Sequence, residues 1–144
     1  MRILVIIVVL IVVLVVGFAL YVRMAPTDAA AWHIDPAQGV SGAGSAAEGQ
    51  DGSLLFEETP ETLLARLDAI AMATPRTERL AGSPEEGRIT YITRSALFGF
   101  PDYTTVSAEP TDTGAKLQIF ARLRFGSSDL GVNAERVKSW LSQL

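Results

Sequence analysis

Four arginines in the C-terminal half of the chain offer the most specific chemistry in the sequence. Arg88 and Arg94 have the same parity on one predicted strand. Arg122 and Arg124 have the same parity on another. Because alternate residues of a strand point to one face of a sheet, neighbouring strands could gather these arginines into a cationic patch. The guanidinium fork suits carboxylates and phosphates, so the patch predicts an anionic ligand or a lipid headgroup. The alternative is a solvated sheet face on which the arginines pair with nearby acids.

Two aspartates close to these arginines in the sequence could act as a carboxylate pair. Asp102 follows a proline at a predicted turn and Asp129 precedes a predicted helix, and both are common structural positions for aspartate. Asn133 lies one helical turn after Asp129, so their side chains could face the same space. We favour a structural role for the pair and predict no catalytic residue. The alternative is an envelope hydrolase in which the two aspartates do acid–base work. Its anion clamp would consist of Arg94, Arg122 and Arg124.

No other group in the sequence predicts a catalytic or metal site. His33 is the single histidine, and its nearest possible orienting partner is Asp35. We expect His33 instead to form an interfacial pair with Trp32, beside a membrane or against the domain. The chain has no cysteine, which excludes disulfides, thiolate metal sites and a lipid-modified cysteine. Phosphate-binding loops, dinucleotide-binding glycine patterns and nucleophile elbows are also missing, so we predict no cofactor.

An uninterrupted apolar run precedes all of these residues. From Ile3 to Val22 there is no charged residue, and a helix of this length reaches about 30 Å, the thickness of the hydrocarbon layer of a bilayer. We predict a single transmembrane helix over residues 1–23, which contacts the membrane lipid bilayer through Ile3–Val22. One alternative is a cleaved signal peptide, with Ala29-Ala30-Ala31 as a possible cleavage site. The other is a buried core helix.

The charges that flank the run predict where the domain lies. Arg2 and the N-terminal amine precede it and Arg23 follows it, so the basic charges are nearly balanced. The short N-terminal side favours an N-in orientation in the inner (plasma) membrane, with the domain outside the cytoplasm. The whole chain has a formal net charge of -4, from 12 basic and 16 acidic residues. No net positive field favours nucleic acid as a partner.

The rest of the chain divides into a linker and one small domain. Residues 24–53 form a juxtamembrane segment and linker. From Ala37 to Ser53 the residues are almost all Gly, Ala, Ser, Gln and acids, a composition typical of a flexible linker. We therefore place the domain at residues 54–144 and expect it to move freely on this tether.

The domain has the pattern of an α+β fold. Thr59-Pro60-Glu61 predicts the start of a helix that ends at Thr74-Pro75. About four strands separated by short turns follow, and the clearest is Lys116–Phe125, where apolar and polar residues alternate. Gly126-Ser127-Ser128-Asp129 leads into a last helix. Short turns favour antiparallel neighbours, so we expect a meandering sheet with helices on one face.

Three functions are compatible with these patterns. The one that we favour is a membrane-tethered module without enzymatic activity that binds an anionic ligand or an envelope protein. The hydrolase described above is the second. A lipid-handling module is the third, and it predicts an apolar cavity that opens to the bilayer. The residues expected to line that cavity are Phe98, Phe100, Phe120 and Phe125.

Several motifs, in order along the chain, resemble one bacterial family. They are Thr93-Arg94-Ser95, Phe98-Gly99-Phe100-Pro101-Asp102-Tyr103 and Arg122-Leu123-Arg124-Phe125-Gly126-Ser127-Ser128-Asp129-Leu130-Gly131-Val132-Asn133. They resemble the family numbered 1499 among domains of unknown function, over roughly residues 55–144. Many members carry a Cys-Pro…Pro-Asn-Cys-Val stretch that this chain lacks, and the family implies no established activity. The resemblance implies a ligand site or an internal scaffold formed by Arg94, Asp102, Tyr103, Arg122, Arg124, Asp129 and Asn133.

Overall fold

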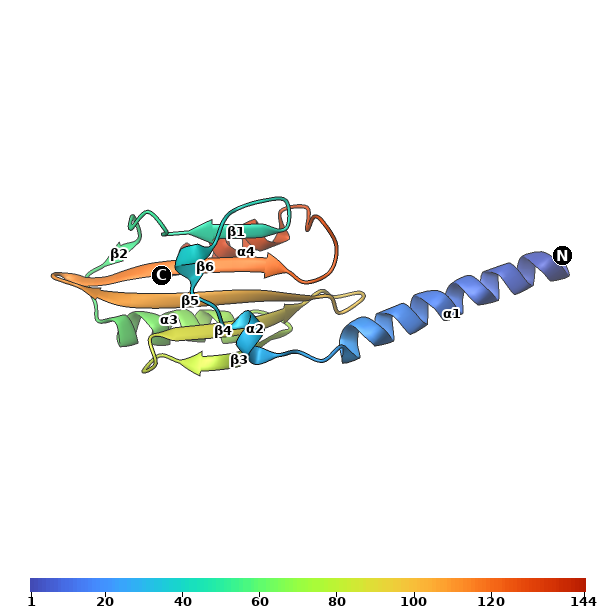
Figure 1. Ribbon diagram of the computed structural model, residues 1–144, viewed down its shortest axis with the longest axis horizontal. Coiled ribbons are helices and arrows are strands. Elements are labelled where there is room, and N and C mark those ends of the chain that lie inside the picture. The colour runs from blue at the N-terminus through green and yellow to red at the C-terminus, as the bar shows by residue number, and fades with distance from the viewer.

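The computed structural model describes residues 1–144 and contains a long N-terminal helix, an α+β domain and a segment that joins them (Figure 1). The helices are α1 (Arg2–Met24), α2 (Ala29–Trp32), α3 (Pro60–Ala73) and α4 (Val132–Leu141), with a 3-10 turn η1 (Pro36–Gln38). The strands are β1 (Ser45–Glu48), β2 (Leu55–Phe56), β3 (Thr77–Ser83), β4 (Arg88–Arg94), β5 (Pro101–Thr111) and β6 (Gly114–Leu123).

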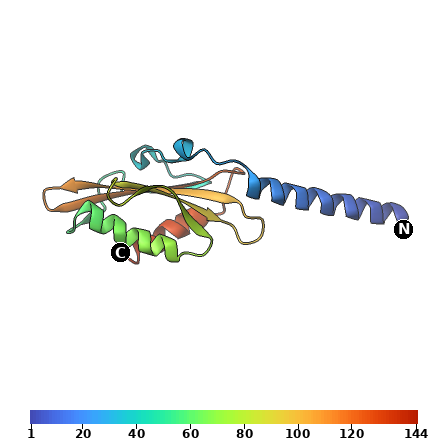
Figure 2. The same cartoon turned by 90° about the horizontal axis from the view of Figure 1, so that it is seen from below.

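The strands form one antiparallel sheet in the order β1-β6-β5-β4-β3, and β2 also pairs with β6. Strands β3 to β6 are the meander expected from the sequence. Both α3 and α4 cover the same face of the sheet (Figure 2). The predicted α+β class is confirmed, and the sheet has six strands rather than about four.

The alternation in β6 builds the core between the sheet and the two helices. Its small and aliphatic residues of one parity are buried on the helix face. They are Ala115, Leu117, Ile119 and Ala121, and they meet Leu63, Leu64 and Leu67 of α3 and Val137 and Trp140 of α4. Trp140 Nε1 donates a hydrogen bond to Thr74 Oγ1 at 2.9 Å, which joins α4 to the end of α3.

Helix α3 begins and ends where the sequence predicts. Thr59 Oγ1 accepts a hydrogen bond from the Thr62 backbone N–H at 3.2 Å, and proline occupies the first helical turn. After Thr74 the chain turns sharply through Arg76, whose φ of 58° lies in the left-handed region. The Arg76 carbonyl then accepts a hydrogen bond from the Arg94 backbone N–H at 2.9 Å. This turn places Arg76 beside the end of β4.

Residues 37–53 are packed against the sheet, contrary to the prediction of a flexible linker. Strand β1 pairs with β6 along its whole length, and Ala46 is buried. Small residues are needed because the backbone runs close to the sheet: a Cβ at Gly39 would lie 2.6 Å from the Phe120 ring. The composition that suggested flexibility therefore reflects close packing, and the folded domain begins before residue 54.

Residues 25–39, which we call the strap, cross the sheet face that α3 and α4 leave open (Figure 2). The Trp32 ring stacks on the Tyr103 ring with 3.8 Å between centroids. His33 Nδ1 lies 2.8 Å from Thr90 Oγ1. Both faces of the sheet are therefore covered, one by helices and the other by the strap.

Helix α1 projects away from the domain (Figure 1). It is the one helix long and apolar enough to cross a membrane, and none of its most apolar window is buried in the structure. A membrane span and a signal sequence share this pattern. Only its last turns contact the domain: Phe18 lies 6.0 Å from Phe100, and Tyr21 lies 6.3 Å from Phe125, between ring centroids.

Candidate functional site

The sheet separates the residues predicted to form the site. In the register, Asp102 lies opposite Leu123, whereas Tyr103 lies opposite Arg122. Because consecutive side chains alternate between faces, Asp102 faces the helices while Tyr103 and Arg122 face the strap. Arg88, Arg94 and Arg122 share the strap face by register. They do not form one open patch, because each contacts a different segment of the chain.

Arg122 supports the strap through backbone and ring contacts. Its Nη2 donates a hydrogen bond to the Trp32 carbonyl at 2.8 Å. Its guanidinium lies 5.0 Å from the Trp32 ring and 4.8 Å from the Phe120 ring, so it makes a cation–π contact with each. Burial lowers the pKa of Arg122. These contacts make Arg122 part of the scaffold, with a backbone carbonyl rather than an acid as its partner.

Arg124 and Tyr103 hold the start of the strap. Arg124 Nη2 donates a hydrogen bond to the Pro26 carbonyl at 2.9 Å. The Tyr103 hydroxyl and Thr27 Oγ1 are 3.0 Å apart, and Arg124 Nη1 donates to both, at 3.3 and 3.4 Å. The chain directly after α1 is therefore attached to β5 and to the end of β6, which limits how α1 can turn relative to the domain.

His33 and Asp35 do not form the acid–base pair considered from the sequence. Asp35 Oδ1 accepts a hydrogen bond from the Ala37 backbone N–H at 3.0 Å and so caps η1. His33 instead contacts Thr90 on β4. Burial, followed by the charge of Arg88, lowers the pKa of His33. Both residues therefore stabilise the strap, His33 through its contact with β4 and Asp35 by capping η1.

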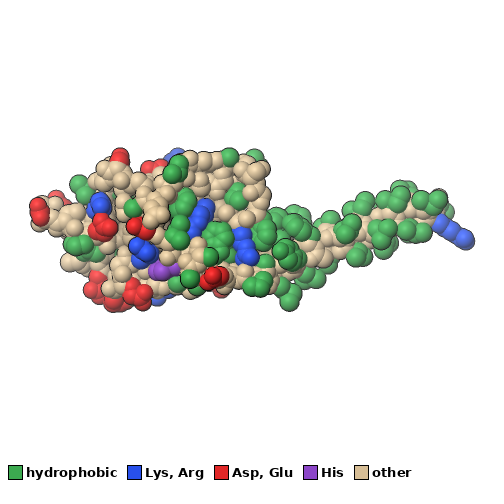
Figure 3. Space-filling model, in the orientation of Figure 1, with side chains coloured by type: hydrophobic (Ala, Val, Ile, Leu, Met, Phe, Trp, Pro, Cys, Tyr) green, Lys and Arg blue, Asp and Glu red, His purple; other side chains and the backbone are tan.

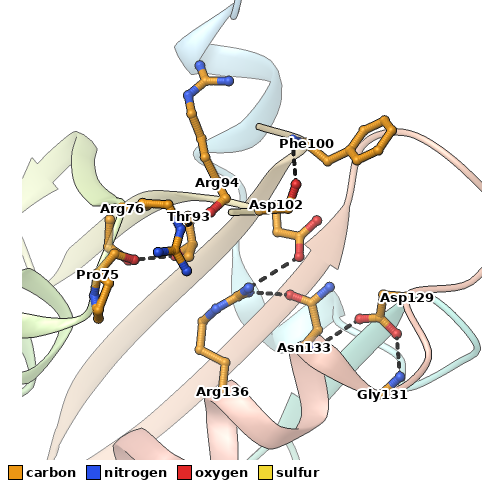
Figure 4. A network of polar contacts seen from close by, with 12 residues as sticks. Pro75, Arg76, Thr93, Arg94, Phe100, Asp102, Asp129, Gly131, Asn133 and Arg136 are labelled. Carbon is orange, nitrogen blue, oxygen red and sulfur yellow. Dashed lines mark hydrogen bonds and ion pairs between the residues drawn. The ribbon is translucent and has the colours of Figure 1, made fainter. Parts of the chain in front are cut away.

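On the helix face, an arginine that the sequence patterns did not single out joins the predicted polar residues (Figure 4). Arg136 Nη2 lies 3.2 Å from Asp102 Oδ2, and Arg136 Nη1 donates a hydrogen bond to Asn133 Oδ1 at 2.6 Å. Asp129 Oδ2 accepts from the Asn133 backbone N–H at 2.8 Å, and its Oδ1 accepts from Gly131 at 3.0 Å. Arg136 lies three residues after Asn133, a spacing that puts both on one side of α4. That spacing is the signal that could have identified Arg136.

The two carboxyl groups of this network have opposite pKa shifts. Burial raises the pKa of Asp102, although the nearby charge of Arg136 lowers it. Burial also acts to raise the pKa of Asp129, but the backbone N–H groups of Asn133 and Gly131 outweigh it, so the pKa of Asp129 is lowered. Asp102 is engaged in an ion pair and Asp129 in capping α4.

A cavity of about 380 Å³ beside the end of α1 brings three arginines together. Arg23 comes from α1, Arg76 from the turn after α3, and Arg94 from the end of β4. Their hydrogen bonds go to backbone carbonyls: Arg23 to Leu97 and Phe98, Arg76 to Arg94, and Arg94 to Gly99. None of the three forms an ion pair, although Glu78 also lies in the lining. We call this space the arginine cavity.

A second hollow of about 570 Å³ adjoins the arginine cavity on the helix face of the sheet. Arg76 and Arg94 line both spaces. The Asp102–Arg136 ion pair lies in the lining of the second, together with an apolar set: Ala96, Phe100, Leu123, Phe125 and Val132. A cationic cavity and a partly apolar groove thus meet at the end of the sheet nearest α1.

The chain matches one known protein family and one solved structure, and both matches agree with this fold. Residues 34–144 match the family described as "Protein of unknown function (DUF1499)". The chain belongs to the DUF1499 family. The match begins at residue 34, so it includes the segment in which the sequence predicted a linker.

Among solved structures, the chain is similar to the X-ray crystal structure of protein MLL2253 from Mesorhizobium loti. The TM-score is 0.50 at 15% sequence identity, and the alignment covers 69% of this chain and 90% of that chain. At this identity the likeness shows the fold alone. No match was found among curated proteins.

The seven DUF1499 motif residues therefore lie in three different parts of the structure: the strap contacts, the network at α4 and the arginine cavity. Tyr103, Arg122 and Arg124 hold the strap. A second set forms the network at the start of α4: Asp102, Asp129 and Asn133. Of the seven, Arg94 alone lines the arginine cavity. Its two companions, Arg23 and Arg76, come from segments distant in sequence, so no local pattern identified them.

Asp129→Ala is expected to lower the free energy of unfolding by about 1 kcal/mol at neutral pH, because it removes the cap of α4. The folded pKa of Asp129 is lowered relative to its unfolded value, near 3.9. Its contribution is therefore present above that unfolded value and is lost as the pH falls through the folded pKa. Urea unfolding at neutral and acidic pH measures both effects. Glu135→Gln, an exposed change in the same helical turn, is the control, and a loss that stayed equal at every pH would contradict the assignment.

Proposed function

We propose that this protein is a single-pass membrane protein whose DUF1499 domain binds an anionic ligand in the arginine cavity and catalyses no reaction. In this proposal α1 spans the inner (plasma) membrane with its N-terminus in the cytoplasm, and the domain lies outside the cytoplasm. The observation that carries the proposal is the convergence of Arg23, Arg76 and Arg94 around one cavity without an acidic partner.

The three guanidinium groups keep hydrogen-bond donors available. Each guanidinium carries five N–H donors, and the contacts above use one or two of them. Three guanidinium groups outnumber the single carboxylate in the lining, that of Glu78, and none of them is ion-paired, so a positive potential remains that a bound anion would relieve. Carboxylates and phosphates match the guanidinium fork, so these are the ligand groups that we expect.

A retained α1 agrees with the contacts of its last turn. Cleavage near Ala29-Ala30-Ala31 would remove Arg23 from the arginine cavity and Pro26 and Thr27 from their contacts with Arg124. The exposed apolar surface of α1 also needs a cover, which a lipid bilayer would provide. Both points favour an anchor over a signal peptide that is cut off.

The hydrolase alternative has no comparable support. Asp102 would have to leave its ion pair with Arg136, and Asp129 would have to stop capping α4, before either could transfer a proton to a substrate. The two carboxylates also have opposite pKa shifts for reasons that the fold itself explains. We therefore assign a structural role to this network, which joins α4 to β5 and stabilises the start of α4.

The double variant Arg76→Gln, Arg94→Gln is expected to lose most of its anion binding. The probe is glycerol phosphate, added to the full chain in micelles of an uncharged sugar detergent. Hydrogen bonds between charged groups contribute about 1.5–3 kcal/mol each, so each arginine lost should weaken binding by about tenfold or more. Calorimetric titration and the rise of the melting midpoint measure the effect.

Arg66→Gln is the matched control for this experiment. Arg66 is an exposed arginine that pairs with Glu58 and does not line the arginine cavity, so its loss should leave the binding unchanged. If the double variant bound glycerol phosphate as well as the wild type and the control do, the arginine cavity would not be an anion site.

A further inference from the structure

The end of the domain nearest α1 is apolar where it meets the helix. Phe98 and Phe100, from the loop between β4 and β5, line a hollow together with Leu14, Val15 and Phe18 of α1. Phe125, just after β6, contacts both Phe100 and Tyr21. Leu97, in the same loop as Phe98, is 76% exposed. We call Leu97, Phe98, Phe100 and Phe125 the apolar tip.

The contacts of the apolar tip fix its level along α1. Phe18 precedes Val22, the last residue of the uncharged run, by four positions, and Leu14 precedes it by eight. At 1.5 Å per residue these positions lie about 6 and 12 Å inside the run. Phe100 packs on Phe18, and the hollow that Phe98 and Phe100 line extends to Leu14. The loop is therefore level with the apolar part of α1, and lipid that surrounds α1 would also surround the loop.

The distribution of charge in the domain agrees with a tip that lies in lipid. From Ser95 to Pro101 the loop has no charged residue. The antiparallel meander puts the β3–β4 and β5–β6 turns at the opposite end, and these turns carry Glu85, Glu86 and Asp112. In Figure 3 acidic side chains gather at that far end, while hydrophobic side chains continue from the helix onto the near end of the domain.

The arginine cavity lies directly behind the apolar tip. Arg23 immediately follows Val22, and its guanidinium bonds the carbonyls of Leu97 and Phe98. A Cβ at Gly99, whose φ is +74°, would lie 2.9 Å from the Arg23 side chain, so this glycine is needed both for the turn and for the approach of the arginine. An arginine that follows an apolar span lies at the headgroup layer, where its long side chain reaches the phosphates.

We infer that the apolar tip enters the lipid layer and that the anion held in the arginine cavity is the phosphate of an anionic membrane lipid. This inference rests on the proposed membrane span and anion site, and it adds the depth of the domain and the class of the ligand. The bilayer is then a partner of the domain as well as of α1. A lipid headgroup reaches the cavity from the surface on which the domain sits.

Single cysteines with a nitroxide label test the depth of the tip, and the absence of native cysteine makes each label unique. The labels are placed at Leu97→Cys in the tip, at Leu10→Cys in α1 and at Leu55→Cys, an exposed position on β2. The full chain is inserted in vesicles of phosphatidylcholine and phosphatidylglycerol. We expect the labels at 97 and 10 to be accessible to oxygen and shielded from a water-soluble nickel chelate, and the label at 55 to behave in the opposite way.

The three labels test the immersion of the apolar tip separately from the membrane span of α1. If the label at 97 is as accessible to the chelate as that at 55 while the label at 10 is shielded, the immersion of the tip is wrong and the membrane span stands. If the label at 10 is also accessible to the chelate, the span is wrong and the inference fails with it.

The source of the anion is tested by comparing two forms of one headgroup. Phosphatidylglycerol in mixed micelles should raise the melting midpoint of the full chain at a concentration at least about tenfold below that needed for free glycerol phosphate. The lipid effect should be lost in Arg76→Gln, Arg94→Gln and kept in Arg66→Gln. Equal potency of the lipid and glycerol phosphate would overturn the lipid assignment and leave the anion site. If phosphatidylglycerol raised the midpoint of the double variant as much as that of the wild type, both the lipid assignment and the anion site would be wrong.

Discussion

A chain that begins at residue 54 is expected not to fold cooperatively, whereas one that begins at residue 26 should melt as a single domain. The shorter chain lacks the strap and β1. It would expose the edge of β6, which now pairs with β1 along the whole length of that strand. It would also leave the half-buried guanidinium of Arg122 without the Trp32 carbonyl and ring. The loss should exceed about 5 kcal/mol, which is most of the stability of a small domain.

Circular dichroism melts and size-exclusion chromatography of the two chains measure this difference. A third chain that begins at residue 40 keeps β1 and removes the whole strap, so its midpoint should fall between the other two. If the chain from residue 54 were as stable as that from residue 26, residues 37–53 would be the flexible linker that their composition suggested, and the contacts of the strap would contribute no stability.

The parts of the fold that were predicted correctly have a local cause. The alternation along β6 follows from the pleat of a strand, and α3 begins where Thr59 can cap and Pro60 can start a helix. These signals lie within a few residues of the element that they specify. The α+β class follows from the order of such elements along the chain.

The parts that were not predicted depend on contacts between distant segments. Strand β1 has little strand propensity of its own, and the glycines that precede it are explained only by the closeness of β6 side chains: a Cβ at Gly39 would meet Phe120, and one at Gly44 would meet Leu123. Similarly, Arg23, Arg76 and Arg94 meet in one cavity because α1, the turn after α3 and β4 all end there. No residue spacing within the sequence predicts that these three arginines line one cavity.

The division of the motif residues between two faces depends on register. Asp102 and Tyr103 are neighbours in the sequence, yet one faces α4 and the other faces the strap. Parity correctly predicted that several arginines share one face. It could not predict that the strap would cover this face and that backbone carbonyls would take the place of acids or ligands.

Arg136→Met is expected to lower the free energy of unfolding by about 3 kcal/mol at neutral pH. The side chains of Arg136 and Asp102 are only 9% and 14% exposed, so the variant leaves a carboxylate in the groove without its cation. Removing one member of a buried ion pair costs about 3–5 kcal/mol, and we take the lower value because Asp102 keeps some contact with water. Methionine retains the apolar stem of arginine, so the loss reports the charge rather than the packing.

The pH dependence of this loss separates a buried charge from a simple packing defect. Burial raises the folded pKa of Asp102, and the charge of Arg136 makes that increase smaller. In the variant the folded pKa should rise further above the unfolded value, near 3.9. Protonation of Asp102 then stabilises the fold as the pH falls from neutral through that raised pKa, so the deficit of the variant should shrink in acid.

Two further variants complete the test of the ion pair. Asp102→Asn combined with Arg136→Met should be more stable than Arg136→Met alone, since no unpaired charge remains in the groove. Arg66→Met breaks the exposed pair with Glu58 and should cost less than about 1 kcal/mol. Denaturant unfolding of the four proteins gives these values. If Arg136→Met cost no more than Arg66→Met, Asp102 would be solvated in the folded state, and the groove beside the arginine cavity would be open to water and to small ligands.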